Sequence, residues 1–94
     1  MIPLFKFKIK GDSMIPTFKE NDVVLVNRLS YFLSPPKIGD LIILKRGQYM
    51  IKRIKEIKND EYFVVGDNKK ESVDSRRFGW IDREDIVGKV LIKI

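Results

Sequence analysis

Short runs of alternating or wholly apolar residues recur along the chain and are separated by turn-forming residues. Residues 3–10 alternate, with Phe5, Phe7 and Ile9 apolar and lysines between them, which predicts a strand with one apolar and one basic face. Shorter apolar runs predict further strands at 23–26, 41–44, 48–57, 61–65 and 87–94. Many short strands without an amphipathic helix predict a mainly β fold, an antiparallel sandwich or open barrel, in a single domain over residues 1–94.

Two long segments between these strands, 27–40 and 65–80, are predicted to be loops because they are rich in proline, glycine and polar residues. The first of them nevertheless carries Tyr31, Phe32 and Leu33. Such a cluster either packs under the sheet, which we expect, or faces outward and contacts a membrane surface or a substrate. At most a short helical turn is expected after Ser13.

The composition excludes several kinds of chemistry. The chain has no histidine and no cysteine, so we expect no disulfide, no zinc site and no cofactor. The net charge of +6 favours acidic partners, although lysines that keep a small protein soluble are the simpler interpretation. Nucleic acid is not expected, because the aromatic and basic residues of 3–10 point to opposite faces. With no apolar run of about 20 residues and no secretory signal, we expect a cytoplasmic protein or a peripheral one at a membrane surface.

The best nucleophile candidate is Ser13, in the glycine- and proline-bounded bend GDSMIPT. A serine hydroxyl attacks poorly unless a neighbouring base removes its proton, and the chain has no histidine to serve as that base. Lys52 lies on a predicted strand and shares a face with Met50 and Ile54. Burial in such surroundings lowers the pKa of a lysine by up to about 3 to 5 units. Lysine is rarely buried, however, so strand position alone does not assign Lys52 as the base.

Further motifs accompany these two residues in a fixed order. They are GDSMIPTFKENDVVLVNRLSY, PKIGDLIILKR, the IKR of 51–53, GDNKKESVDSRRFGW and the terminal IVGK. In order and approximate spacing this set resembles the conserved boxes of type I signal peptidases, a serine/lysine peptidase family, from about residue 8 to residue 89. The resemblance implies a minimal catalytic domain with a mainly antiparallel β fold. It also implies a serine endopeptidase that removes leader or pro segments from precursor proteins.

The resemblance assigns a role to each matching residue. Ser13 matches the nucleophile and Lys52 the general base, while Ser72 matches a serine whose hydroxyl orients the lysine amine. Asp74 and Arg76 match an ion pair that shapes the active-site loop.

The oxyanion hole is only partly assigned by the motifs. The backbone N–H of Ser13 is the expected donor to the oxyanion. Some family members place a second donor, a serine hydroxyl, where this chain has Gly11, so the role of Gly11 in the oxyanion hole is left open.

The substrate of such peptidases binds as an extended strand, which by analogy places it along residues 8–12 and 48–51. The implied substrate-binding residues are Ile9, Lys10, Asp12, Met50 and Ile51. The resemblance further implies a substrate with small side chains near the cleavage site. Because the membrane anchor and the inserted β subdomain of larger members have no counterpart in the sequence, attachment to a membrane would need peripheral contact or a membrane-bound partner.

Two other functions remain open at this point. The first is a soluble maturation protease for one dedicated precursor, such as the propeptide of a nickel-type superoxide dismutase. Self-cleavage, as in the SOS repressors that share this fold, is disfavoured because little chain precedes Ser13. The second is a non-catalytic basic β module that binds nucleic acid or anionic lipid, and its binding would weaken steeply with salt and survive loss of Ser13.

Overall fold

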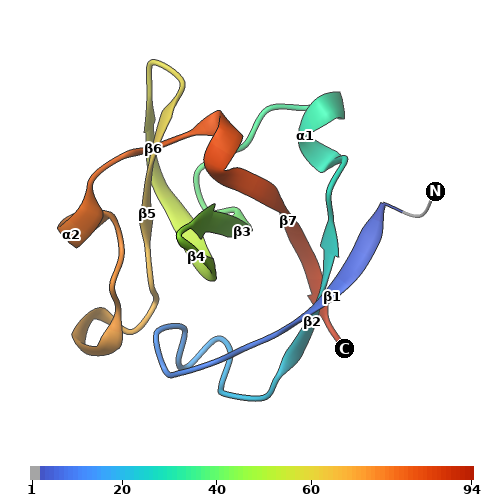
Figure 1. Ribbon diagram of the computed structural model, residues 1–94, viewed down its shortest axis with the longest axis vertical. Coiled ribbons are helices and arrows are strands. Elements are labelled where there is room, and N and C mark those ends of the chain that lie inside the picture. Colours follow the sequence, from blue (N-terminus) through green and yellow to red (C-terminus); the bar gives the residue numbers. More distant parts are fainter. Residues whose placement is uncertain (1–2) are drawn as a thin grey trace.

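The computed structural model describes residues 3–94, in which seven strands form one curled antiparallel sheet that resembles an open half-barrel (Figure 1). The strands are β1 (Leu4–Lys8), β2 (Val23–Asn27), β3 (Leu41–Arg46), β4 (Gln48–Lys58), β5 (Glu61–Val65), β6 (Ile81–Asp82) and β7 (Ile86–Lys93). Their order in the sheet is β1-β2-β7-β3-β4-β5-β6. The predicted mainly β fold is confirmed, and the six predicted strands are present with small shifts at their ends.

Within residues 3–94, helical structure is limited to single turns. These are α1 (Ser30–Leu33), α2 (Ser75–Phe78), η1 (Lys69–Glu71) and η2 (Arg83–Asp85). Residues 13–17 form turns, so the short helices lie elsewhere than directly after Ser13. The pattern did not predict them, or the two-residue strand β6, because elements of two to four residues are too short to show a period. No helix among residues 3–94 is long and apolar enough to cross a membrane.

The sheet has an apolar cluster on each face. The cluster on one face consists of Ile9, Met14, Phe18, Val24, Val26, Ile43, Ile51 and Val90, with Phe5 and Phe7 packed against it. The cluster on the other face consists of Ile42, Leu44, Ile54, Tyr62, Val64, Ile81 and Ile86. Because neighbouring residues of a strand point to opposite faces, a strand between two clusters is apolar throughout. This explains the continuous apolar run in β3.

The expectation for the aromatic cluster of residues 31–33 is only partly right. Tyr31 packs against the second apolar cluster, and its hydroxyl donates to Asp40 Oδ2 at 2.6 Å. Phe32 and Leu33 are 76% and 91% exposed, so their predicted packing under the sheet is wrong. A single helical turn projects its side chains in several directions, and Tyr31 takes the direction that faces the sheet.

Two features of the fold place the candidate residues. The β3–β4 hairpin turns at Gly47, which has a φ of 78°, and its register sets Lys52 opposite Ile42 in the middle of the sheet. The loop between β1 and β2 is held by the buried side chains of Met14 and Phe18. Ile9, which precedes Ser13, is buried in the same cluster, so buried residues before and after Ser13 fix where it lies.

Candidate active site

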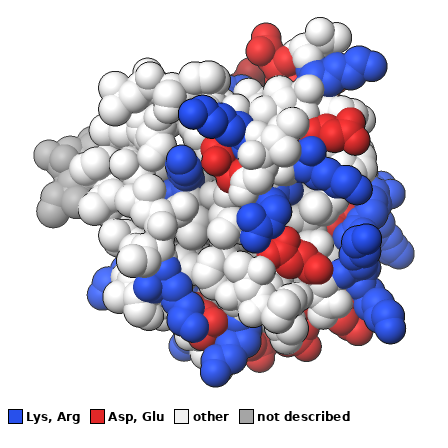
Figure 2. All heavy atoms as spheres, turned by 180° about the vertical axis from the view of Figure 1, so that it is seen from behind, with Lys and Arg blue, Asp and Glu red and all other residues white. Residues whose placement is uncertain are grey.

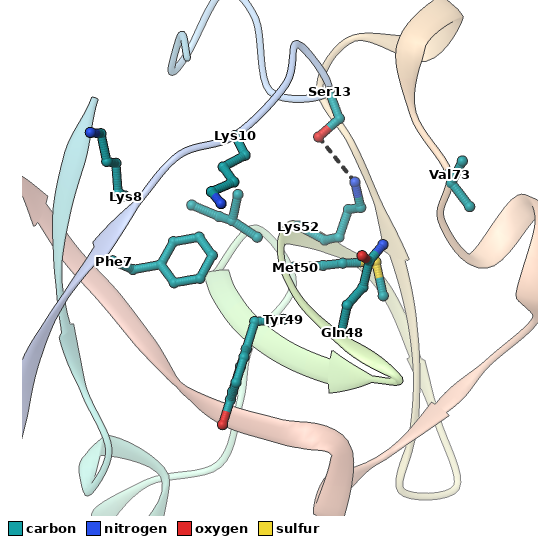
Figure 3. A pocket seen from close by; sticks show the side chains of 10 residues that line it. Phe7, Lys8, Lys10, Ser13, Gln48, Tyr49, Met50, Lys52 and Val73 are labelled. Atoms are coloured by element: carbon teal, nitrogen blue, oxygen red, sulfur yellow. Dashed lines mark hydrogen bonds between the residues drawn. The ribbon is translucent and has the colours of Figure 1, made fainter. Parts of the chain in front are cut away.

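Ser13 and Lys52 lie in contact with each other although they are 39 residues apart in the sequence. The Nζ of Lys52 lies 3.1 Å from Ser13 Oγ and 3.3 Å from Ser72 Oγ, within hydrogen-bond distance of both, and Figure 3 shows the first of these contacts. Lys52 is only 3% exposed. The structure thus brings together the three residues that the motifs suggested for nucleophile, base and orienting hydroxyl.

The surroundings of Lys52 shift its amine towards the neutral form. Burial lowers the pKa of the Lys52 amine, and this effect outweighs the nearby carboxylate of Asp74, which raises it; the Arg76 charge lowers it further. On the same face of β4, Ile54 is fully buried and Met50 is partly buried, as the alternation predicted. An amine in this position holds a proton less tightly than an exposed lysine does.

Asp74 is a fully buried carboxylate that organises the residues around the amine. Its Oδ2 accepts hydrogen bonds from Ser72 Oγ at 2.7 Å, from the backbone N–H of Gly66 at 2.8 Å and from Arg76 Nη2 at 2.6 Å. Its Oδ1 accepts from the backbone N–H and Nε of Arg76. Burial alone would raise the pKa of Asp74, but these hydrogen bonds outweigh it and hold the pKa well below its ordinary value.

The ionised state of Asp74 sets the direction of the hydrogen bonds. An ionised carboxylate only accepts, so Ser72 gives its hydroxyl proton to Asp74 and keeps its lone pairs for an N–H of Lys52. A neutral amine has two N–H groups and one lone pair. With one N–H directed at Ser72, the lone pair is free to accept the hydroxyl proton of Ser13, 3.1 Å away. The arrangement is therefore suited to activating a serine hydroxyl.

We expect Asp74→Asn to lower the free energy of unfolding by about 2 to 3 kcal/mol at pH 7, because the charge that Arg76 and two other donors satisfy is lost. Since the folded-state pKa of Asp74 is lowered, its contribution is fully present above the unfolded value of 3.8 and is lost as the pH falls below it. Urea unfolding at pH 7 and pH 3 measures both effects. Asp60→Asn in the exposed β4–β5 turn is the matched control, and equal denaturation midpoints for wild type and Asp74→Asn at pH 7 would refute this account.

Residues 66–68, the GDN motif, hold the Ser13 bend in place through hydrogen bonds. The backbone N–H of Asn68 donates to the Ser13 carbonyl at 2.8 Å, and its side-chain amide donates to the Asp12 carbonyl at 3.0 Å. The Thr17 hydroxyl donates to the Asp67 carboxylate. The motif GDN was noted in the sequence without a role for any of its residues, and its signal was only that a glycine and two small polar residues follow a strand.

Asp67 also links residues 66–68 to the strand that carries Lys52. Arg53 donates to both oxygens of Asp67 at 2.9 Å and, through Nη1, to the Gly39 carbonyl at 3.0 Å. The adjacent residues Lys52 and Arg53 therefore have different tasks, because they point to opposite faces of β4. Lys52 contacts Ser13 directly, whereas Arg53 holds the segment that positions the bend.

A groove with a volume of about 470 Å³ passes over the Ser13–Lys52 pair (Figure 3). Its lining consists of Phe7, Lys8, Lys10, Ser13, Gln48, Tyr49, Met50, Ile51, Lys52 and Val73. Three of the predicted substrate-binding residues, Lys10, Met50 and Ile51, are in that lining. Ile9 is instead buried in the core, and Asp12 is exposed without lining the groove.

The backbone donors near Ser13 differ in their availability. The Gly11 N–H donates to Glu20 Oε1 at 3.2 Å. Within residues 3–94, the Ser13 N–H makes no such hydrogen bond. Among the same residues, no group of three or more acidic side chains is arranged to hold a metal ion.

Comparison with known proteins places these features in a family. The family model described as signal peptidase, peptidase S26, matches residues 1–55 and 48–94, which together cover the chain. The chain belongs to the signal peptidase S26 family. This confirms the family resemblance inferred from the ordered motifs.

Similar S26 family members include signal peptidase IB of Staphylococcus aureus, 35% identical over 96 residues that cover 95% of this chain and 47% of the relative. Probable signal peptidase I-1 of Synechocystis is 27% identical over 133 residues, covering 90% of this chain and 68% of the relative. Signal peptidase I of Leptolyngbya laminosa is 24% identical, covering 90% of this chain and 66% of the relative. The chain thus spans about half to two thirds of the length of these relatives. The two longer alignments exceed the chain in length, so those relatives carry residues inserted within the matched region.

Proposed function

We propose that this chain is a serine endopeptidase in which Ser13 is the nucleophile and Lys52 the general base, and that it cleaves leader segments from precursor proteins. The observation that carries the proposal is the buried amine of Lys52 at 3.1 Å from the Ser13 hydroxyl. A buried amine with a lowered pKa is the residue type that can replace histidine as a base in a chain without histidine.

The reaction follows from the hydrogen bonds around Lys52. Ser13 Oγ attacks the carbonyl carbon of the scissile peptide bond as its proton passes to Lys52 Nζ. The resulting ammonium is held by Ser72 Oγ at 3.3 Å and attracted by the carboxylate of Asp74. The ammonium then donates its proton to the leaving amine, and the neutral amine it regenerates activates the water that releases the acyl group.

The oxyanion formed in the attack needs a donor close to Ser13. The backbone N–H of Ser13 fits this role because it has no other partner among residues 3–94. The Gly11 N–H is occupied by Glu20, so we assign the oxyanion contact to Ser13 alone.

The groove beside the pair would hold the substrate as an extended chain. One wall of the groove is lined by Phe7, Lys8 and Lys10 and the other by residues 48–51, so both walls offer extended backbone for hydrogen bonds to a peptide. The relatives are named signal peptidases, which favours a leader segment with small residues before the cleavage site. The exposed side chains of Phe32 and Leu33 are the surface that would touch a membrane.

Ser13→Ala is expected to lower the cleavage rate of a detergent-solubilised preprotein, carrying alanine at positions −1 and −3, by about 10³-fold or more, because no other group replaces the nucleophile. Gel analysis of the processed product over time measures the rate. Ser34→Ala, in the exposed segment after α1, is the matched control and should cleave like wild type. If Ser13→Ala cleaves the preprotein at the wild-type rate, the assignment of Ser13 as the nucleophile is wrong.

A further inference from the structure

A second depression, with a volume of about 480 Å³, lies between η1 and α2 and is strongly basic. Its charged lining residues are Lys69, Lys70, Glu71, Arg76 and Arg77, four cations and one acid. Figure 2 shows Lys and Arg side chains gathered along the side of the molecule that carries α2 in Figure 1. We call this site the η1–α2 depression.

The η1–α2 depression adjoins the candidate active site. Its lining includes Ser72, which contacts Lys52, and Val73, which also lines the end of the groove that extends past the Ser13–Lys52 pair. In Figure 3, Val73 lies on one side of that pair, whereas Lys8 and Lys10, at the other end of the groove, lie on the other. A peptide that occupies the groove and passes Ser13 therefore meets the η1–α2 depression next.

Three of the four cations are available to bind a ligand. Arg76 is committed to Asp74, with its Nη2 2.6 Å from the carboxylate. Lys69, Lys70 and Arg77 are exposed, and none of them takes part in an ion pair within residues 3–94. Uncompensated cations around a concave surface attract carboxylates and disfavour basic groups.

We propose that the η1–α2 depression binds aspartate or glutamate side chains of the substrate in the residues that directly follow the scissile bond. This inference rests on the proposed function, in which the groove holds the residues before that bond. The depression then selects precursors whose mature part begins with an acidic segment.

A peptide fits the η1–α2 depression better than an anionic lipid surface does. The depression adjoins the groove, with Val73 lining both, which is the position that a subsite for the same peptide needs. The exposed apolar side chains Phe32 and Leu33 belong to α1, which lies apart from α2 in Figure 1. The cations and these apolar residues therefore do not form one surface that could lie flat on a membrane.

The test compares two peptides that share an alanine-rich cleavage site and differ only in the residues after it. These residues are aspartate and glutamate in the acidic peptide and asparagine and glutamine in the amide peptide. Each exposed ion pair contributes little to binding. In the triple variant Lys69→Gln/Lys70→Gln/Arg77→Gln, we therefore expect the kcat/KM of the acidic peptide divided by that of the amide peptide to fall by about tenfold. The preference should also shrink as salt is raised. The matched control Lys37→Gln/Lys55→Gln/Lys58→Gln removes the same charge from exposed positions outside both cavities and should keep the wild-type ratio.

A binding measurement separates this inference from the proposed function. Fluorescence anisotropy with Ser13→Ala protein reports affinity for the two peptides without cleavage, so discrimination there supports the subsite even if wild type cleaves neither peptide. Equal affinity for the two peptides, or a preference only for acidic residues placed before the cleavage site, overturns the inference. The inference is also overturned if the triple variant no longer binds phosphatidylglycerol vesicles but still discriminates between the two peptides as wild type does. The depression would then bind a lipid surface.

Discussion

Lys52→Met is expected to abolish peptide cleavage, with a loss of about 10³-fold or more, while the protein stays folded. Methionine keeps the length and apolar character of the side chain but has no group to accept the proton of Ser13. Rates on the same preprotein, measured at equal concentrations of folded protein, test this directly. Lys55→Met changes an exposed lysine of the same strand and should cleave like wild type.

The same substitution should raise the stability of the fold at neutral pH. Because the folded-state pKa of Lys52 is lowered from 10.5, the unfolded chain binds more protons than the folded one in the pH range between the two values. Wild-type stability therefore rises with pH through that range, and at neutral pH Lys52 makes a net unfavourable contribution. Lys52→Met removes this contribution. The gain in its free energy of unfolding over wild type, measured with urea, should therefore be largest at neutral pH and should shrink towards pH 10.5. Unchanged cleavage by Lys52→Met would rule out Lys52 as the base, whatever its effect on stability.

Ser72→Ala tests whether Ser72 orients the Lys52 amine without taking part in the proton transfer itself. Ser72→Ala leaves the Lys52 amine in place but removes the acceptor that directs one of its N–H groups. The loss of activity should therefore be smaller than for Lys52→Met, and the pH at which activity appears should change. A simple structural defect would lower the rate at every pH without moving the profile.

The sequence predicted the parts of the site that local patterns encode. The alternation of β4 put Lys52 on the same face as Ile54, and the buried amine in the structure agrees with that reading. The alternation of residues 3–10 likewise put Phe5 and Phe7 against the core. Strand periodicity carries this information because each side chain's face follows from its position alone.

The contacts that hold the bend could not be predicted from such patterns. Asn68 reaches the Asp12 carbonyl across 56 positions of sequence, and no local period links two loops that far apart. The exposed state of Phe32 was missed for a related reason, since a four-residue helix has no period from which to read its buried face. Motif order supplied the identity of the residues, whereas the fold alone shows how Asp74 connects them.

Gly66→Ala is expected to lower both stability and activity, because this position has no room for a side chain. A Cβ built there would lie 2.2 Å from Ser72 Oγ and 2.6 Å from the carbonyl oxygen of Ser13. Relieving such overlap costs about 1 to 3 kcal/mol. It also moves the residues next to the Lys52 amine, and a displacement of about 1 Å in a catalytic group costs on the order of 10²-fold in rate.

Gly88→Ala separates the loss of site geometry from general destabilisation. A Cβ at Gly88 would also be crowded, at 2.8 Å from both the Asn27 carbonyl oxygen and Val26 Cγ1. Gly88, however, is a residue of β7 next to β2, and it lines neither cavity. Both variants should unfold at lower urea concentrations than wild type. Only Gly66→Ala should lose about 10²-fold in kcat per folded molecule, since only its side chain presses on Ser72 and the Ser13 bend. Equal losses of kcat in the two variants would show that Gly66 supports the fold in general and does not position the Ser13–Lys52 pair.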